Sequence, residues 1–110
     1  MVWTVVYLPD AVVEEREGLP ARERQALYSA TLKLQAIGPT LGYPHTSAVQ
    51  GASGLRELRP RAGRGPWRAL YRPVGKRFVI AAITPEAQHD PAGFARACAA
   101  ATRRSSELED

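Results

Sequence analysis

The chain has 110 residues, of which 45% are hydrophobic and 24% charged, and its net charge at pH 7 is +4. This length suits one domain with a modest core, so we expect a single domain. The longest apolar runs are far shorter than the ~20 residues of a transmembrane helix, and no leader precedes Val2, so we expect a soluble, cytoplasmic protein. The single cysteine, Cys98, cannot form an internal disulfide or a two-thiol metal site, and we interpret it as a core residue.

Basic residues are concentrated in one part of the chain. Of the 15 Lys and Arg residues, eight lie between Arg56 and Arg77, where Glu57 is the only acid. The first quarter of the sequence is balanced to acidic. The basicity therefore belongs to one region, which is a candidate anion-binding surface.

The first predicted elements are a strand and two helices. Residues 2–7 are rich in β-branched and aromatic side chains, which favour a strand. Asp10 is a suitable N-cap for a short helix that ends at Glu17. A longer helix is predicted over residues 21–37, where Gly38 supplies the stop. Its apolar stripe consists of Leu27, Ala30, Leu34 and Ile37.

The middle of the chain predicts a loop and then a β-meander. Residues 38–54 hold four glycines and two prolines and fit neither periodicity, so we expect an ordered loop. Three strands follow, at residues 55–59, 67–73 and 76–83. Their connections are short, which makes the neighbouring strands antiparallel.

Asp90 and Pro91 open a last helix, predicted to run to about Arg104. Phe94, Ala97, Cys98 and Ala101 form its apolar face. We expect residues 1–104 to form the domain and residues 105–110 to be a frayed tail. The predicted order βααβββα defines an α+β fold in which one face of the sheet is partly open to a ligand.

Several strings of residues resemble the RelE/ParE superfamily of toxins, specifically its HigB-like, phage-associated branch. They are residues 3–7, residues 32–45, and residues 54–61 leading into residues 67–72. The resemblance implies a RelE-like domain with a mostly antiparallel four-stranded sheet, two N-terminal helices and one C-terminal helix.

The resemblance also implies a function. The chain is expected to be the toxin of a type II toxin-antitoxin system and an enzyme, a ribosome-dependent mRNA endoribonuclease that inhibits translation. In this chemistry a ribose 2′-hydroxyl attacks the adjacent phosphate, which requires a base, an acid and cations but neither a metal nor a cofactor. Arginine suits the cationic role because its planar fork grips two phosphate oxygens.

The resemblance implies the site residues as well. Arg68 matches the arginine that contacts the scissile phosphate, and we expect it to be an exposed strand residue. Arg59 and Arg61 are expected at outward positions at the end of the second predicted strand. The predicted catalytic residues are Arg68, His89 and Arg59. The predicted RNA-binding residues are Arg56, Arg61, Arg64, Arg72, Tyr71, His45 and Lys76. Trp67 and Tyr71 could instead belong to the core, and His45 could be structural.

Residues 84–91 depart from the family pattern, in which lysines are usual. Pro85, Glu86 and His89 stand at the corresponding positions. His89 could serve as acid or base near neutral pH, with Asp90 orienting its ring. The alternative is that Asp90 only caps the helix and His89 is a loop residue.

Two other functions share the fold. One is a ParE-like toxin that binds gyrase and has no nuclease activity. The other is a degenerate toxin that acts as a co-repressor with its antitoxin, which the acidic Glu86 favours. In every case the resemblance implies a helix-turn-helix antitoxin as partner, with DNA contacted only through it. The nuclease hypothesis requires the guanidinium groups of Arg59, Arg61 and Arg68 to converge on the open face, free of internal carboxylates.

Overall fold

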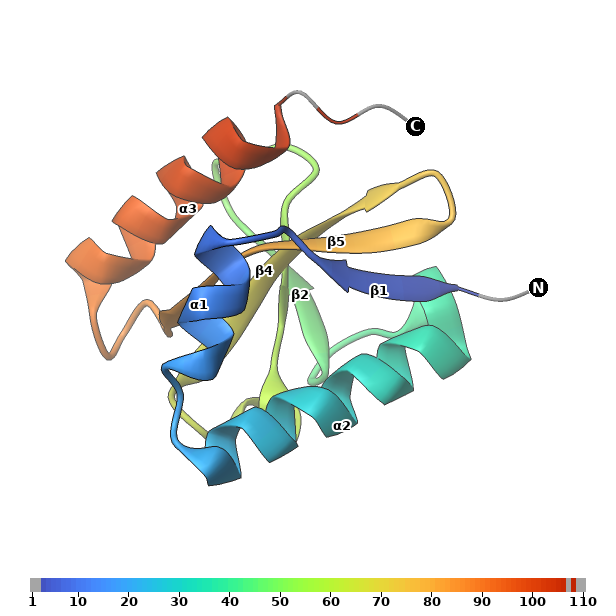
Figure 1. The fold of residues 1–110 in the computed structure, drawn as a ribbon, viewed down its shortest axis with the longest axis horizontal. Coiled ribbons are helices and arrows are strands. Elements are labelled where there is room, and N and C mark those ends of the chain that lie inside the picture. The colour runs from blue at the N-terminus through green and yellow to red at the C-terminus, as the bar shows by residue number, and fades with distance from the viewer. Residues whose placement is uncertain (1–2, 107, 109–110) are drawn as a thin grey trace.

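The computed structural model describes residues 3–106 and 108. Within these residues a five-stranded sheet, ordered β1-β5-β4-β3-β2, packs with three α-helices (Figure 1). The elements are β1 (Thr4–Tyr7), α1 (Ala11–Glu17), α2 (Ala21–Ile37), β2 (Thr46–Ala48), β3 (Arg56–Leu58), β4 (Trp67–Val74), β5 (Arg77–Pro85) and α3 (Pro91–Ser105). Two short 3₁₀ turns are η1 (Gly38–Thr40) and η2 (Pro60–Gly63).

The predicted α+β class is confirmed, and the predicted strand count is short by one. β2 lies inside the predicted loop, where Thr46 pairs with Leu58 of β3. β2, β3, β4 and β5 are antiparallel neighbours, while β1 pairs with β5 in the parallel direction. A three-residue edge strand has too few residues to show a period of two.

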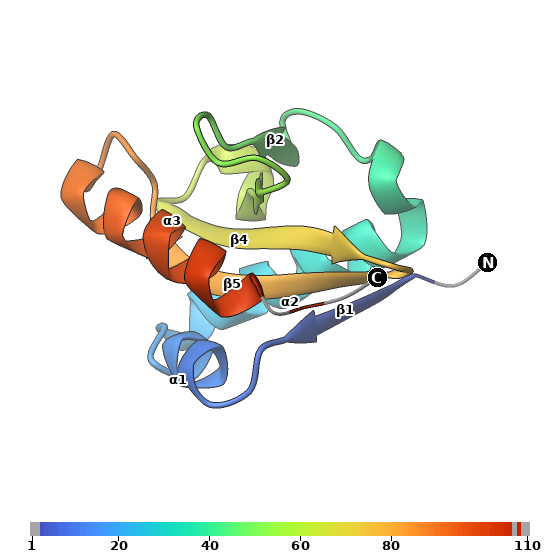
Figure 2. The ribbon, with the colours of Figure 1, turned by 90° about the horizontal axis from the view of Figure 1, so that it is seen from above.

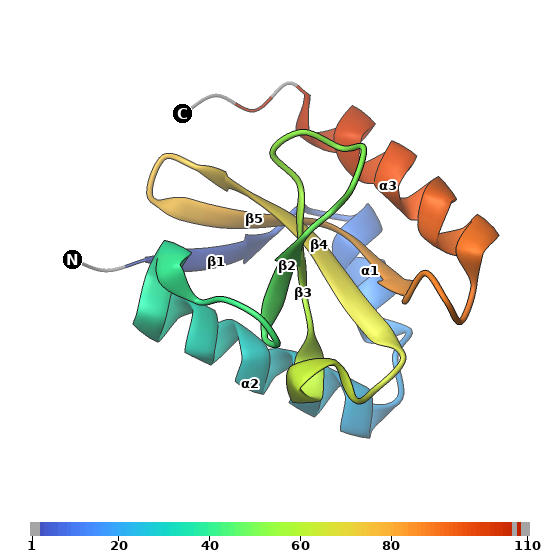
Figure 3. The same ribbon diagram turned by 180° about the vertical axis from the view of Figure 1, so that it is seen from behind.

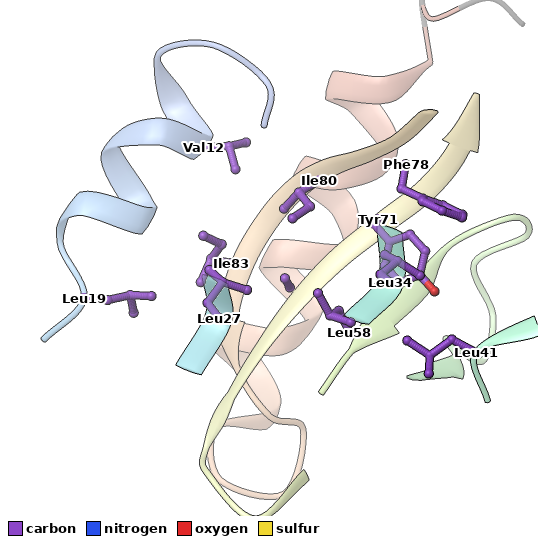
Figure 4. Packing of buried hydrophobic residues seen from close by; sticks show 11 residues of the cluster. Val12, Leu19, Leu27, Leu34, Leu41, Leu58, Tyr71, Phe78, Ile80 and Ile83 are labelled. Carbon is purple, nitrogen blue, oxygen red and sulfur yellow. The ribbon is translucent and has the colours of Figure 1, made fainter. Parts of the chain in front are cut away.

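The two faces of the sheet are covered differently. Figure 2 shows α1 below the strands and α2 behind them, with α3 beside β4 and β5 and no helix over β2. The larger core cluster lies between the sheet and the first two helices (Figure 4). Its buried members are Val12, Leu19, Leu27, Leu34, Leu41, Leu58, Ala69, Tyr71, Phe78, Ile80 and Ile83. On the other face, the residues that connect β2 to β3 also contribute to a core cluster, in which Val49 and Leu55 are buried.

α3 forms a second, smaller cluster as predicted. Phe94, Ala97, Cys98 and Ala101 pack with Leu70, Ala81 and Ala82 of the sheet. Burial, with a further contribution from Glu57, raises the pKa of the Cys98 thiol, which keeps it protonated at neutral pH. The helix continues through Ser105, which is buried, so the predicted tail begins too early. Residues 107, 109 and 110 of that tail lie outside the described residues. No helix in the described ranges combines the length and the apolar character needed to cross a bilayer.

The ends of α1 and α2 agree only in part with the sequence-based expectations. Asp10 occupies the predicted N-cap position of α1 and its carbonyl accepts the Glu14 N–H at 2.8 Å, but its side chain makes no capping hydrogen bond. α2 has the predicted bounds, but Ile37 is exposed and does not continue the buried stripe. Gly38 has φ of 82°, and a Cβ there would lie 2.9 Å from the Trp3 indole nitrogen. Only glycine fits this helix end without strain.

Glu15 and Arg104 join α1 and α3 across β5. The β4–β5 register shifts between Leu70 and Tyr71, which marks a β-bulge. Near it, Arg104 Nη1 donates to the Ala81 carbonyl at 2.9 Å, and the Ile83 N–H donates to Glu15 Oε1 at 3.0 Å. Arg104 Nη2 and Glu15 Oε2 form an ion pair at 3.0 Å. The two side chains thus satisfy two backbone groups of β5.

Glu15→Ala is expected to lower the free energy of unfolding by about 1–2 kcal/mol, because it removes the acceptor of the Ile83 N–H together with the partner of Arg104. Urea denaturation measures this loss. Glu14→Ala, a carboxylate removed from the exposed side of the same helix, serves as the control and is expected to change stability by less than about 0.5 kcal/mol. Equal losses in the two variants would contradict this role of Glu15.

Candidate functional site

A basic hollow lies between α2 and the segment that follows β3. Figure 3 shows the η2 turn, between β3 and β4, lying over α2. The hollow has a volume of about 440 Å³. Its charged and titratable lining consists of Arg22, Lys33, His45, Arg59, Arg61 and Arg64. Its floor includes Ala26, Ala30, Leu41 and Leu58. None of the described residues that line it is acidic, so the lining of the hollow is cationic.

Arg59 is held firmly at the wall of this basic hollow. Its Nε donates to the Pro44 carbonyl at 3.1 Å, and Nη1 lies 3.3 Å from Glu57 Oε1. Gly63 packs against the guanidinium, because a Cβ there would lie 2.6 Å from Nη2. The Arg59 side chain is 18% exposed and is among the residues that line the hollow.

Arg68 is buried, and the prediction that it is an exposed strand residue is wrong. It is only 4% exposed, and its Nε donates to Glu57 Oε1 at 3.1 Å. Nη1 donates to the carbonyls of Gly65 and Trp67, and Nη2 donates to that of Gly63. Burial, and then the charge of Arg59, lowers the pKa of Arg68, while Glu57 and Glu86 act in the opposite direction. All three of its guanidinium nitrogens therefore donate to groups within the protein.

Glu57 is the centre of this arrangement. A single carboxylate oxygen, Oε1, receives both Arg59 and Arg68. Two cations therefore share one anion, and the cluster retains one positive charge. Arg68 is the more deeply buried partner, so Arg59 is the cation of the cluster that lies nearer to solvent.

The turn after β3 places two more arginines on the basic hollow. Arg61 and Ala62 have φ of 57° and 54°, a left-handed conformation that is costly for residues other than glycine. This backbone directs Arg61 to an ion pair with Glu23 of α2. Arg64 is exposed and donates from Nε to the Arg61 carbonyl at 3.1 Å. Arg61 is thus in a turn and paired, contrary to its predicted place on an outward strand position.

Four predicted RNA-binding residues lie away from the basic hollow. Tyr71 is 2% exposed and packs edge-on against Phe78 in the larger core cluster, so its predicted contact with RNA is wrong. Arg56 Nη2 donates to Thr46 Oγ1 at 2.9 Å, and Arg72 Nη1 donates to the Ser105 carbonyl at 3.4 Å. Lys76 lies in the turn between β4 and β5.

Only one of the two histidines lies at the basic hollow. His45 lines the basic hollow, and its carbonyl accepts the Arg59 backbone N–H at 2.8 Å. His89 is exposed in the turn before α3, outside the lining of the hollow. Asp90 Oδ1 accepts the Gly93 N–H at 3.0 Å and caps α3. The capping role of Asp90 is therefore confirmed, and among the described residues no hydrogen bond joins Asp90 to the His89 ring.

Sequence reasoning missed the role of Glu57 and the position of Tyr43. Glu57 was recognised as the only acid in the basic segment, and alternation along a strand would place it on the same face as Arg59. Tyr43 lies in the predicted loop, with its ring 5.2 Å from the Arg59 guanidinium carbon. In residues 3–106 and 108, no group of three or more His, Cys, Asp or Glu side chains is arranged to hold a metal ion.

The fold is a small α+β fold that is also found in a solved structure. It is similar to a solved structure of the E. coli toxin RelE in the free state, a variant with two arginines replaced. The TM-score is 0.63 at 13% sequence identity, with 88% of this chain and 95% of that chain covered. At this identity the match demonstrates the fold alone.

Residues 14–82 match the model of a family described as phage derived protein Gp49-like, which covers more than half of the chain. The chain belongs to this family, and the predicted membership of the RelE superfamily of toxins is confirmed. The comparison with curated proteins gave no match.

Proposed function

We propose that this toxin inhibits translation by holding single-stranded mRNA in the basic hollow on the ribosome and cutting it there. The observation that carries the proposal is the cationic lining of the hollow. Arg59 belongs to this lining, and the single charge of Glu57 does not neutralise both Arg59 and Arg68. A phosphate group is the ligand that such a surface attracts most strongly in a cell.

The chemistry assigns roles to the residues around the basic hollow. The ribose 2′-oxygen forms a bond to the adjacent phosphorus, and the bond from phosphorus to the 5′-oxygen breaks. A base takes the proton of the 2′-hydroxyl, and an acid returns a proton to the leaving 5′-oxygen. Arg59 stabilises the charge that builds on the phosphate oxygens. Proton transfer belongs to His45, whose backbone adjoins Arg59, in place of the predicted His89.

Arg68 then has an indirect role. Its hydrogen bonds to Glu57 and to the carbonyls of Gly63 and Gly65 fix the carboxylate that in turn holds Arg59. Prior fixation of Arg59 avoids the loss of side-chain entropy when the phosphate binds.

His45→Ala is expected to reduce RNA cleavage by about 10²–10⁴-fold, the usual range for loss of a general acid or base. His89→Ala is the matched control, because it removes the same ring from an exposed turn, and it is expected to retain full activity. The assay is cleavage of a translated mRNA by purified protein in a translating extract. Loss of activity in the His89 variant, or full activity in the His45 variant, would reverse the assignment.

A second candidate function is a toxin that binds its target without cutting RNA. The expectation that Arg59, Arg61 and Arg68 are free of internal carboxylates is wrong, because each of them pairs with Glu57 or Glu23. These ion pairs favour the second function, and the proposal of RNA cleavage rests only on the cationic lining of the basic hollow as a whole. The same extract separates the two functions. Translation that stops while the mRNA stays intact would support binding alone, and loss of DNA supercoiling would support a gyrase-directed toxin.

The superfamily implies an antitoxin as partner, and we infer that acidic side chains of the antitoxin occupy the basic hollow. The charge of the hollow complements such a segment, and occupation would exclude RNA by competition. A helix-turn-helix antitoxin would then provide the contact with DNA.

A further inference from the structure

Tyr43 presents an aromatic ring to solvent beside the basic hollow. The residue is 76% exposed and belongs to neither core cluster. The other large hydrophobic residues exposed in the described chain, Tyr28, Leu32 and Ile37, all lie on α2 and are less exposed. Tyr43 therefore contributes almost nothing to the core.

The ring of Tyr43 is not isolated, because Arg59 supports it. The guanidinium carbon lies 5.2 Å from the ring centroid, within the range of a cation–π contact. Arg59 cannot swing away, since Pro44 and Glu57 both accept hydrogen bonds from it. With the cation on one face and such high exposure, the opposite face of the ring is open to solvent.

This supported ring stands at the border of the basic hollow. His45, two residues along the chain, and Arg59, its cation–π partner, both line the hollow. A polyanionic strand whose phosphates enter the hollow would therefore carry its neighbouring groups past Tyr43.

We propose that Tyr43, backed by Arg59, is a stacking platform for one unpaired nucleobase of the RNA strand. The inference rests on the proposed function and adds a contact to the bases, whereas the cations of the hollow contact phosphates. Stacking on an aromatic ring is the usual way in which proteins hold single-stranded RNA, and it tolerates any base. Tyr43 thus contributes affinity and selects unpaired strands over duplexes.

An acidic peptide is the competing ligand for this region. Its carboxylates would pair with the cations of the basic hollow, but the negative face of an aromatic ring does not attract a carboxylate. A flat nucleobase uses both features at once, which favours RNA.

The test is fluorescence anisotropy of the purified protein with a short labelled oligoadenylate at low salt. Tyr43→Ala is expected to weaken binding by about tenfold, within the range measured for loss of one stacked base. Tyr43→Phe keeps the ring and is expected to bind as the wild type does. A strand of the same length with abasic riboses keeps every phosphate, so the wild type and Tyr43→Ala are expected to bind it equally. The salt dependence is expected to be the same in all three proteins, because no phosphate contact is lost.

The outcomes separate this inference from the proposed function. If the wild type binds oligoadenylate and Tyr43→Ala binds it equally well, the platform is wrong while the RNA-binding hollow stands. If the wild type binds no RNA, the proposed function fails and the platform fails with it. If Tyr43→Ala binds RNA normally but loses affinity for polyglutamate, the ring serves a protein partner and the inference is overturned.

Discussion

Glu57→Ala is expected to lower the free energy of unfolding by about 3 kcal/mol, the largest stability effect that we predict for a single substitution. Removing one partner of a buried ion pair typically costs about 3–5 kcal/mol, because the other charge remains buried without compensation. Arg68 is only 4% exposed and cannot turn to solvent. The substitution also removes the carboxylate that separates the charges of Arg68 and Arg59, so the two guanidinium groups would repel each other.

Urea denaturation of the wild type and three variants measures this effect. Glu57→Gln keeps an acceptor without the charge, and its loss is expected to lie between those of the wild type and the alanine variant. Glu17→Ala removes the carboxylate of an exposed pair with Arg16 and is expected to change stability by less than about 0.5 kcal/mol. A loss below about 1 kcal/mol for Glu57→Ala would contradict the central role given to this carboxylate.

Arg59→Ala is expected to reduce RNA cleavage by about 10²–10³-fold, the range found when one group that stabilises transition-state charge is removed. The fold should survive, because Glu57 remains paired with Arg68 and no charge is left without a partner. We therefore expect a stability loss of about 1 kcal/mol or less. This contrast, a large loss of activity with a small loss of stability, distinguishes Arg59 from Glu57.

The matched control for Arg59 is Arg77→Ala. It removes the same charge from an exposed position at the start of β5, outside the basic hollow. Initial rates of cleavage of a defined mRNA on programmed ribosomes, with unfolding measured in parallel, compare the two variants. Equal losses of activity would mean that only the overall positive charge matters.

Much of the fold could be predicted because its signals are local. α2 begins after Pro20 and ends at Gly38, and the capping of α3 by Asp90 follows from neighbouring residues. β2 could not be predicted, since its three residues are a strand only by pairing with β3. The parallel pairing of β1 with β5 joins segments that are distant in sequence, and no local pattern encodes it.

The site was harder to predict than the fold. The alternation of side chains along β4 correctly predicts that Arg68 lies on the opposite face of the sheet from Trp67 and Tyr71. It does not predict which segments cover that opposite face. Arg68 is buried because the segment of residues 63–67 supplies carbonyl acceptors and Glu57 of β3 reaches it from the neighbouring strand. Arg61 departs from the predicted strand because its backbone is left-handed, which no residue preference indicates for arginine.

The most direct test of the central claim is to map new RNA ends in a translating extract after adding the purified toxin. The account predicts new 5′ ends within translated reading frames, none when translation is blocked, and almost none with Arg59→Ala. Arrest of translation by the wild type with every mRNA left intact would contradict it.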